Sequence, residues 1–148
     1  MVKITVLMAV RDTLPTMLRQ AIKSIRGQTL REFELLILDD GSEQAETCAE
    51  LERQAAGDSR IRLERGPPRG VTATLNRGLA LAAGAFIARQ DADDWSEPRR
   101  LERQMEYVRA HPETTPRPSM SPIRFWWLQT AISSSPMGMR PVPATMRG

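Results

Sequence analysis

Residues 4–10 of the chain, ITVLMAV, are apolar or β-branched without interruption. A strand with one face in water alternates apolar and polar side chains, whereas an unbroken run is typical of a strand buried on both faces. A second run, FELLILD at residues 33–39, is also largely apolar, with Glu34 and Asp39 as its polar residues. Such strands favour a parallel sheet, because the crossover connections between parallel strands cover both faces with helices.

The segments that follow these runs predict the helices. Pro15 suits the first turn of a helix, and apolar residues recur after it at helical spacing as far as Gly27. Ser42 is a suitable helix cap and precedes a helical pattern over residues 43–56. Four more elements are expected: strands at residues 61–65 and 85–90, and helices at residues 72–83 and from 98 to about 110. The alternating order predicts an α/β domain, a parallel sheet with helices on both faces.

The composition of the chain changes after residue 113. Residues 114–148 are rich in proline, serine and methionine, contain no Asp or Glu, and lack a helical or alternating period apart from an apolar island at residues 123–132. That composition is not typical of a packed domain. We therefore divide the chain into a folded part, residues 1–113, and an irregular C-terminal tail, residues 114–148, which we expect to be disordered or loosely packed.

The distribution of charge argues against nucleic acid as a partner. The 148 residues include 21 Lys and Arg against 18 Asp and Glu, but four arginines lie in the tail, which leaves 17 basic residues in residues 1–113. A nearly neutral body without a basic stripe is not typical of nucleic-acid binding. The single cysteine, Cys48, fits a reducing compartment, and no run approaches the about 20 apolar residues of a membrane span. We expect a cytoplasmic location, and leave open a peripheral association with the inner face of the membrane.

Acidic residues gather where three of the predicted strands end. The three segments are Arg11–Asp12, Asp39–Asp40–Gly41–Ser42 and Asp91–Ala92–Asp93–Asp94. In an open parallel sheet the carboxyl ends of the strands meet at one edge, and ligands bind there. Carboxylate oxygens are the ligands that Mg²⁺ and Mn²⁺ prefer, and these ions often carry substrate phosphates. The alternative is plain turn chemistry, since Asp-Gly is common in turns and Asp94 could simply cap the next helix.

Four stretches of the sequence, in this order, resemble family 2 glycosyltransferases, the nucleotide-sugar-dependent enzymes with the GT-A fold. They are ITVLMAVRD, QTLREFELLILDDGS, NRGLALAAGAFIARQDADDWSEPRRLERQ and the HPE at residues 111–113. The D-x-D within them is a weak signal by itself, but the ordered series is specific and spans residues 3–113. The resemblance implies a Rossmann-like GT-A parallel sheet, incomplete in this chain.

The resemblance also implies a donor site. Asp91 and Asp93 match the D-x-D motif of the family. Asp93 would coordinate a Mn²⁺ or Mg²⁺ ion that bridges the diphosphate of the donor, and Asp91 would lie toward the ribose or the water shell of the ion. The chemistry implied is transfer of a sugar from a nucleoside-diphosphate sugar to a hydroxyl of a glycan or lipid-linked acceptor, as in bacterial-type polysaccharide or glycan biosynthesis.

Five further residues match positions around the nucleotide in the family. Asp40 matches the acid that contacts the base, and Ala9 and Arg11 occupy positions that line the base pocket, although the family often has an aromatic residue in place of Arg11. Asn76 and Arg77 match an Asn-Arg-Gly stretch near the donor site.

Transfer with inversion also needs a general base to take the proton of the acceptor. In the family this general base is an acidic side chain from the second half of the domain, and residues 114–148 show no such residue. We therefore expect a chain that is truncated or read out of frame near residue 114. The alternative function is a catalytically inactive fragment that at most binds nucleoside diphosphate and metal. Haloacid-dehalogenase-like phosphatases and receiver domains also use acidic pairs, but after the first strand rather than the fourth.

Overall fold

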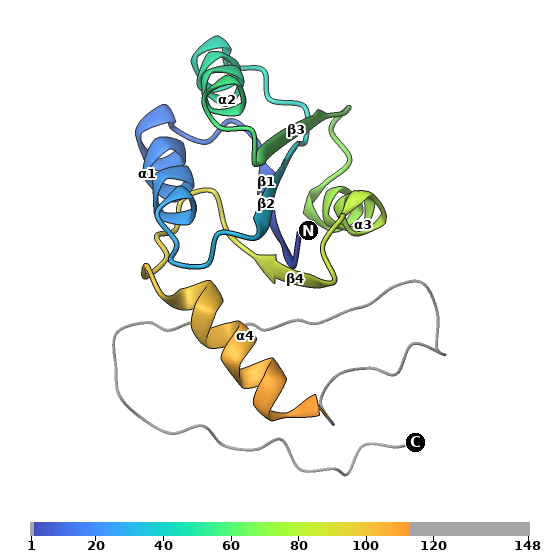
Figure 1. The fold of residues 1–148 in the computed structure, drawn as a ribbon. Coiled ribbons are helices and arrows are strands. Elements are labelled where there is room, and N and C mark those ends of the chain that lie inside the picture. The colour runs from blue at the N-terminus through green and yellow to red at the C-terminus, as the bar shows by residue number, and fades with distance from the viewer. Residues whose placement is uncertain (1, 113–148) are drawn as a thin grey trace, which may run out of the picture.

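The computed structural model describes residues 2–112, and the fold below is the fold of that range. Strands and helices alternate along it in the predicted order (Figure 1). The elements are β1 (Ile4–Val10), α1 (Pro15–Arg26), β2 (Phe33–Asp39), α2 (Ala45–Gly57), β3 (Ile61–Arg65), α3 (Val71–Leu81), β4 (Phe86–Arg89) and α4 (Arg100–Ala110). The expected strands at residues 4–10, 33–39 and 61–65 are confirmed to the residue, and the fourth is one residue shorter at each end.

The described strands form one parallel sheet in the order β3-β2-β1-β4. Ile4 of β1 pairs with Phe33 of β2 on one side and with Phe86 of β4 on the other. After β3 the chain returns through α3 to the far side of β1, so the strand order reverses between β1 and β4. In open α/β sheets, ligands bind at the carboxyl ends of the strands beside such a reversal.

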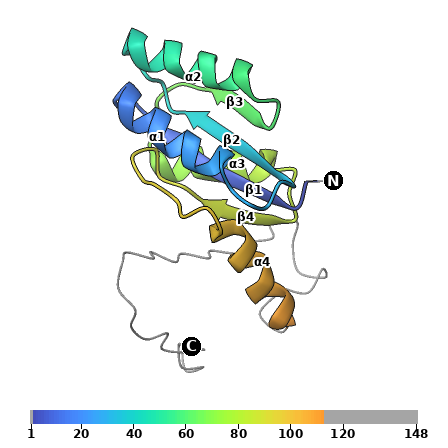
Figure 2. The same cartoon turned by 60° about the vertical axis from the view of Figure 1, so that its left-hand side comes forward.

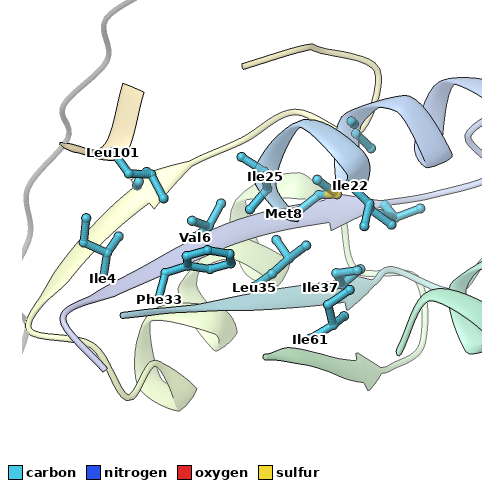
Figure 3. Packing of buried hydrophobic residues seen from close by; sticks show 14 of the residues in the cluster. Ile4, Val6, Met8, Ile22, Ile25, Phe33, Leu35, Ile37, Ile61 and Leu101 are labelled. Atoms are coloured by element: carbon cyan, nitrogen blue, oxygen red, sulfur yellow. The ribbon is translucent and has the colours of Figure 1, made fainter. Parts of the chain in front are cut away.

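Helices cover both faces of this sheet, as the largely apolar runs at residues 4–10 and 33–39 predict. Figures 1 and 2 show α1 and α2 on one face and α3 on the other. The face under α1 holds the larger core, and Figure 3 shows alternate side chains of β1 and β2 directed into it. Its labelled members are Ile4, Val6, Met8, Phe33, Leu35 and Ile37 from β1 and β2, Ile61 from β3, Ile22 and Ile25 from α1, and Leu101 from α4. Each fully buried aliphatic side chain contributes about 2 kcal/mol to folding.

The opposite face is thinner and depends on close approach of α3. Leu7, Leu36 and Leu38 of the sheet pack there with Leu75. A Cβ atom at Gly78 would collide with the side chains of Leu7 and Leu38. A glycine at this position therefore lets α3 lie directly on the strands.

Two helices begin later than their sequences predict. We expected Ser42 to cap a helix from residue 43, but α2 begins at Ala45. The hydroxyl of Ser42 instead accepts the Asp12 amide at 3.0 Å, and the Asp12 Oδ1 accepts the amides of Glu43 at 2.8 Å and Gln44 at 2.9 Å. The two amides just before α2 are therefore bonded from the loop after β1, where Asp12 lies in the left-handed region at φ 47°. A local pattern does not predict a partner 31 residues away.

The fourth helix differs in the same direction. It begins at Arg100 rather than at Pro98, so Asp94 lies six residues upstream and is not its cap, contrary to one reading of the sequence. The described residues contain no helix long and apolar enough to cross a membrane. The tail at residues 114–148, with its expected disorder or loose packing, lies outside the described residues and stays a prediction.

Candidate functional site

The carboxyl end of β2 is closed by a buried acid, Asp40, whose exposed fraction is 6%. The Arg69 amide donates to Oδ1 at 2.7 Å, and the Gly70 amide donates to Oδ2 at 3.0 Å. Burial by itself raises the pKa of the Asp40 carboxyl. The bonds from Arg69, Thr74 and Gly70, with the charge of Arg11, outweigh it and hold the pKa below its ordinary value. Asp40 is therefore a stable anion that fixes the loop leading into α3.

The loop after β2 also depends on Gly41. Its φ is +75°, a conformation that side chains other than glycine adopt rarely. A Cβ atom there would lie 2.7 Å from Cδ and 2.8 Å from N of Pro68. The Asp-Gly pair thus brings the loop after β2 and the loop after β3 into contact beside Asp40.

The acids that follow β4 differ from Asp40 in being exposed. Asp91, Asp93 and Asp94 all face solvent. Asp91 pairs with Arg89, Oδ1 to Nη2 at 2.9 Å, where both side chains are about half exposed. Among residues 2–112, no hydrogen-bond donor or cationic group contacts the Asp93 carboxylate within bonding distance. Asp93 therefore presents an unengaged anion beside the reversal of strand order.

One buried side chain, Gln90, fixes the backbone that carries these acids, and its exposed fraction is 3%. Its Nε2 donates to the carbonyl of Asp91 at 3.1 Å and to the carbonyl of Asp94 at 3.0 Å. The Asp94 amide in turn donates to the Asp91 carbonyl at 3.2 Å. A single amide group therefore holds both ends of the turn that displays Asp93.

The other end of the Gln90 side chain is held by two donors. Its Oε1 accepts the hydroxyl of Ser96 at 2.5 Å and Nη1 of Arg100 at 2.6 Å. Arg100 also donates through Nη2 to the carbonyl of Arg89 at 2.6 Å. Burial lowers the pKa of the Arg100 guanidinium, and the nearby charges of Asp94 and Asp91 oppose that change. The guanidinium is a permanent cation in proteins, so its charge stabilises the acidic loop.

A second glutamine, Gln28, ties this loop to α1. It is fully buried, and its Nε2 donates to the carbonyls of Ser24 at 3.1 Å and Glu97 at 2.7 Å. Its Oε1 accepts the amide of Leu101 at 3.0 Å, at the start of α4. The Ser24 hydroxyl accepts the amide of Ser96 at 3.0 Å. The acidic loop is therefore anchored to the body of the fold at several points.

The donor set at this edge fits a divalent cation that arrives with a phosphate ligand. Asp91 and Asp93 offer hard oxygen ligands on a loop of fixed backbone. Within residues 2–112, no group of three or more His, Cys, Asp or Glu side chains lies close enough to hold a metal ion alone. Mg²⁺ and similar ions are commonly bound by one or two carboxylates together with substrate phosphates. The residues present match that pattern rather than an all-protein metal cage.

The remaining predicted residues lie on or near the same edge. Ala9 is half-buried in β1, on the face that α3 covers, and Arg11 is exposed just past the end of β1. Asn76 is exposed on α3. Arg77 turns toward the end of β3, where its Nη1 donates to the carbonyl of Arg65 at 3.0 Å and its Nη2 lies 3.5 Å from Glu64. Arg11 acts electrostatically on Asp40, whereas Arg77 is engaged with β3.

Sequence reasoning did not identify the residues that position these acids. The sequence places Gln90 at the end of a predicted strand and Arg100 in a predicted helix, and it gives Gln28 no role. Asp12 is predicted only as a polar residue that follows a strand. The one local signal is that two polar residues, Arg89 and Gln90, end the predicted strand before three acids. Its partners lie in segments whose spatial neighbours a local pattern does not reveal.

A basic hollow of about 540 Å³ lies away from this edge, between α1, α2 and the turn before β3. Its arginines already serve two acids. Burial raises the pKa of Glu50, but hydrogen bonds from Arg19, Arg53 and Gln54 outweigh it and lower the pKa to about 2. Arg26 and Arg60 pair with Asp58. These contacts join α1 to α2, and we assign the hollow a structural role.

Comparison with known proteins gives a family match over most of the chain. The model of the family described as Glycosyl transferase family 2 matches residues 5–141. The match runs past residue 113, where the motifs quoted above end, into the part of the chain that the structure does not describe.

Two curated proteins of Bacillus subtilis (strain 168) that are named as glycosyltransferases are among the similar sequences. EpsE is 36% identical over 110 residues, which is 74% of this chain and 39% of EpsE. EpsH is 37% identical over 95 residues, which is 64% of this chain and 27% of EpsH. The chain thus spans less than half the length of either relative.

Solved structures agree on the fold. TarS of S. aureus superposes with a TM-score of 0.66 at 20% identity, covering 74% of this chain and 20% of TarS. The mannosyltransferase PcManGT from Pyrobaculum calidifontis, solved in complex with GDP-Man and Mn²⁺, gives a TM-score of 0.65 at 20% identity, covering 72% of this chain and 32% of PcManGT. At such identities the likeness establishes the architecture alone, and it agrees with the predicted GT-A sheet.

Proposed function

The chain belongs to glycosyl transferase family 2, and from this premise we propose that it binds a nucleoside-diphosphate sugar through a divalent cation and transfers the sugar to an acceptor hydroxyl. The observation that carries the proposal is the Asp93 carboxylate. It is exposed, unpaired among residues 2–112, and carried on the turn that follows β4, beside the strand-order reversal of the sheet. An anion kept free in this way, on a fixed backbone, is suited to a cation that comes from solution.

Known complexes support the choice of ligand class. The mannosyltransferase of similar fold was solved with GDP-Man and Mn²⁺, and a TarS fragment of residues 1–349, with a TM-score of 0.66, was solved with UDP-GlcNAc. For this chain we propose the shared chemistry, a nucleoside-diphosphate sugar with Mn²⁺ or Mg²⁺. The base and the sugar are left open, because they depend on the shape of the pocket.

Each acid receives a separate role in the proposal. Asp93 is the main metal ligand, and Asp91, once released from Arg89, lies toward the ribose or the water shell of the ion. The ion would neutralise the negative charge that develops on the departing diphosphate. Asp40 contacts the nucleobase, and its lowered pKa keeps its carboxylate anionic there.

Neutral and basic residues complete the proposed donor site. Ala9 and Arg11 line the base pocket, with the exposed Arg11 guanidinium offering a planar surface in place of an aromatic ring. Asn76 and Arg77 lie near the donor. The ion pair of Arg77 with Glu64 would have to open for a direct contact with phosphate.

Transfer also requires an acceptor and a general base. We propose a glycan or lipid-linked acceptor in the cytoplasm, in the assembly of a bacterial-type polysaccharide. The resemblance assigns the base to the second half of the domain, beyond residues 2–112. Binding of nucleoside diphosphate and metal without transfer is therefore the second candidate function.

Calorimetry with a panel of nucleoside diphosphates tests the donor site. We expect binding in Mn²⁺ and its loss in excess chelator. Asp93→Ala should weaken metal-dependent binding by about 100-fold or more, the effect of removing a direct ligand. It should leave the melting temperature unchanged, because within residues 2–112 the exposed Asp93 side chain makes no hydrogen bond or ion pair.

Asp94→Ala is the matched control for that variant. Asp94 is also exposed and is directly adjacent, but it is not assigned as a ligand. It should retain binding within a few-fold of the unaltered chain. Equal binding in Asp93→Ala and the unaltered chain, or no metal-dependent binding of any nucleotide, contradicts the proposal.

An assay of radiolabelled sugar release separates the two candidate functions. Release or transfer of sugar that depends on both Mn²⁺ and Asp93 supports a transferase. Metal-dependent nucleotide binding without any release supports the second candidate, a binding fragment without catalysis.

A further inference from the structure

Gln90 contacts more of the acidic loop than any residue so far given a role. Its side-chain amide donates to the carbonyls of Asp91 and Asp94, which bracket Asp93. Its carbonyl oxygen accepts from Ser96 and Arg100. The side chain that makes these four hydrogen bonds is 3% exposed. The two ends of the side chain therefore join the loop on one side to the start of α4 on the other.

The arrangement has the form of a support for metal ligands. Groups that hold metal-binding side chains in place are bonded to them from behind and do not touch the metal. Gln90 lies beneath the loop, its amide bonds go to backbone carbonyls, and the carboxylates of Asp91 and Asp93 stay exposed. A carboxylate on a fixed backbone loses less conformational freedom when it binds a cation than one on a mobile turn.

We propose that Gln90 is a positioning residue, which holds the turn Asp91–Asp94 in the conformation that binds the cation of the donor. The proposal rests on the proposed function, because it assumes that this turn is the metal-binding turn. Ser96 and Arg100 act through Gln90, since they fix the orientation of its side-chain amide. Gln28 has a different task, because its bonds reach Glu97 and Leu101 and not the turn itself.

A purely structural role for Gln90 makes a different prediction. A buried polar side chain with satisfied hydrogen bonds contributes to stability wherever it lies, and its removal lowers the melting temperature. A positioning residue also changes the affinity for the cation and the local opening of the turn. The two roles are separated by comparing Gln90 with a glutamine of similar burial elsewhere.

Gln54 is that control. It is 5% exposed in α2, and its Nε2 donates to Glu50 Oε1 at 2.7 Å. Gln90→Met and Gln54→Met each replace a buried glutamine by an apolar side chain of similar length. Ser96→Ala is a milder variant, which removes only the hydroxyl that bonds Gln90. It covers the case in which Gln90→Met does not fold.

The first measurement is the affinity for Mn²⁺ at saturating nucleoside diphosphate, followed by the electron paramagnetic resonance signal of free Mn²⁺. We expect Gln90→Met to raise the Kd for Mn²⁺ about tenfold, Ser96→Ala to raise it about threefold, and Gln54→Met to leave it within twofold. Folded Gln90→Met and Ser96→Ala variants with the Kd of the unaltered chain would overturn the proposal.

The second measurement needs no ligand. Amide hydrogen exchange of the metal-free chain should be about tenfold faster over residues 91–96 in Gln90→Met, and unchanged there in Gln54→Met. If the unaltered chain binds no nucleotide with Mn²⁺, the proposed function fails, whereas the exchange result still decides whether Gln90 holds the turn. If binding occurs and the Kd for Mn²⁺ responds to neither Gln90→Met nor Ser96→Ala, the positioning role alone fails, whatever the exchange result.

Discussion

The two acidic segments that flank β1 differ in what their carboxylates already bind. On the β2 side, Asp40 is buried, and both of its oxygens accept backbone amides. On the β4 side, Asp91 and Asp93 are exposed, and the backbone around them is bonded through Gln90. The Asp91 carboxylate makes one half-exposed ion pair with Arg89, and within residues 2–112 the Asp93 carboxylate makes none. The Asp40 carboxylate therefore stabilises the fold, whereas the fold holds the Asp91 and Asp93 carboxylates exposed to solvent.

This difference separates acids that sequence motifs treat alike. An anion already satisfied by protein donors has little capacity left for a cation, whereas an exposed anion on a fixed turn keeps its full capacity. Variants on the β2 side should therefore act mainly on stability, and variants on the β4 side mainly on metal binding. The predictions below test this division, beginning with the largest effect.

Asp40→Asn should produce the largest loss of stability at this edge. The variant keeps the shape of the side chain but turns one acceptor into a donor that faces a backbone amide, of Arg69 or Gly70. We expect the free energy of unfolding to fall by about 3 kcal/mol, since a buried amide is left unpaired and a charged acceptor is lost. Chemical denaturation of both chains measures this difference. An Asp40→Asn chain as stable as the unaltered one would remove the structural role of Asp40.

The same pair of chains gives a pH test. The pKa of Asp40 in the folded chain lies below the ordinary value of 3.8. The stability that its ionisation contributes is therefore present above that value and is lost as the pH falls through the folded-state pKa. We expect the stability difference between the unaltered chain and Asp40→Asn to be constant from pH 7 to about 5 and to shrink as the solution is acidified further. A difference that grows on acidification would contradict the assigned direction.

Gly41→Ala should have the next largest effect, again on stability. A side chain at φ +75° is strained, and its Cβ atom would meet the backbone nitrogen of Pro68 at 2.8 Å. We expect a loss of about 2 kcal/mol in unfolding free energy. Gly57→Ala is the matched control, because a Cβ atom there meets nothing within 4 Å. Equal effects of the two substitutions would mean that the contact between the two loops contributes nothing.

Arg89→Gln should have the smallest effect. It should raise the affinity for Mn²⁺, whereas Asp93→Ala and Gln90→Met should lower it. Arg89 pairs with Asp91 at 2.9 Å across an exposed contact. A cation at Asp91 must compete with this pair, which is worth about 0.5 kcal/mol. We expect removal of the guanidinium to raise the affinity for Mn²⁺ about twofold, measured by titration at low ionic strength. A lower affinity in Arg89→Gln would show that Arg89 assists the metal instead of competing with it.

The fold followed from the sequence because its signals are local. The runs at residues 4–10 and 33–39 specified strands buried on both faces, and the helical spacing after each of them specified the crossovers. The topology then brought Asp40 and the Asp91–Asp94 turn to one edge of the sheet.

The hydrogen bonds that position the site residues could not be predicted from the sequence, because most of them join residues far apart in the chain. Asp12 bonds the amide of Glu43, 31 residues away and just before α2, and Gln28 reaches Leu101 across 73 positions. Gln90 bonds near neighbours, but only the conformation of the turn brings both carbonyls to its amide group. No periodic pattern in the sequence predicts hydrogen bonds of this kind.

The central claim is that the cation of the donor binds at the β4 side of the edge, at Asp93, and not at Asp40. Paramagnetic broadening of backbone amide signals by Mn²⁺ locates the ion directly, with Mg²⁺ as the diamagnetic reference. In the presence of a bound nucleoside diphosphate, we expect broadening centred on residues 91–94, and its disappearance in Asp93→Ala. Broadening centred on residues 40–42 or on the basic hollow between α1 and α2, or unchanged broadening in Asp93→Ala, would contradict the claim.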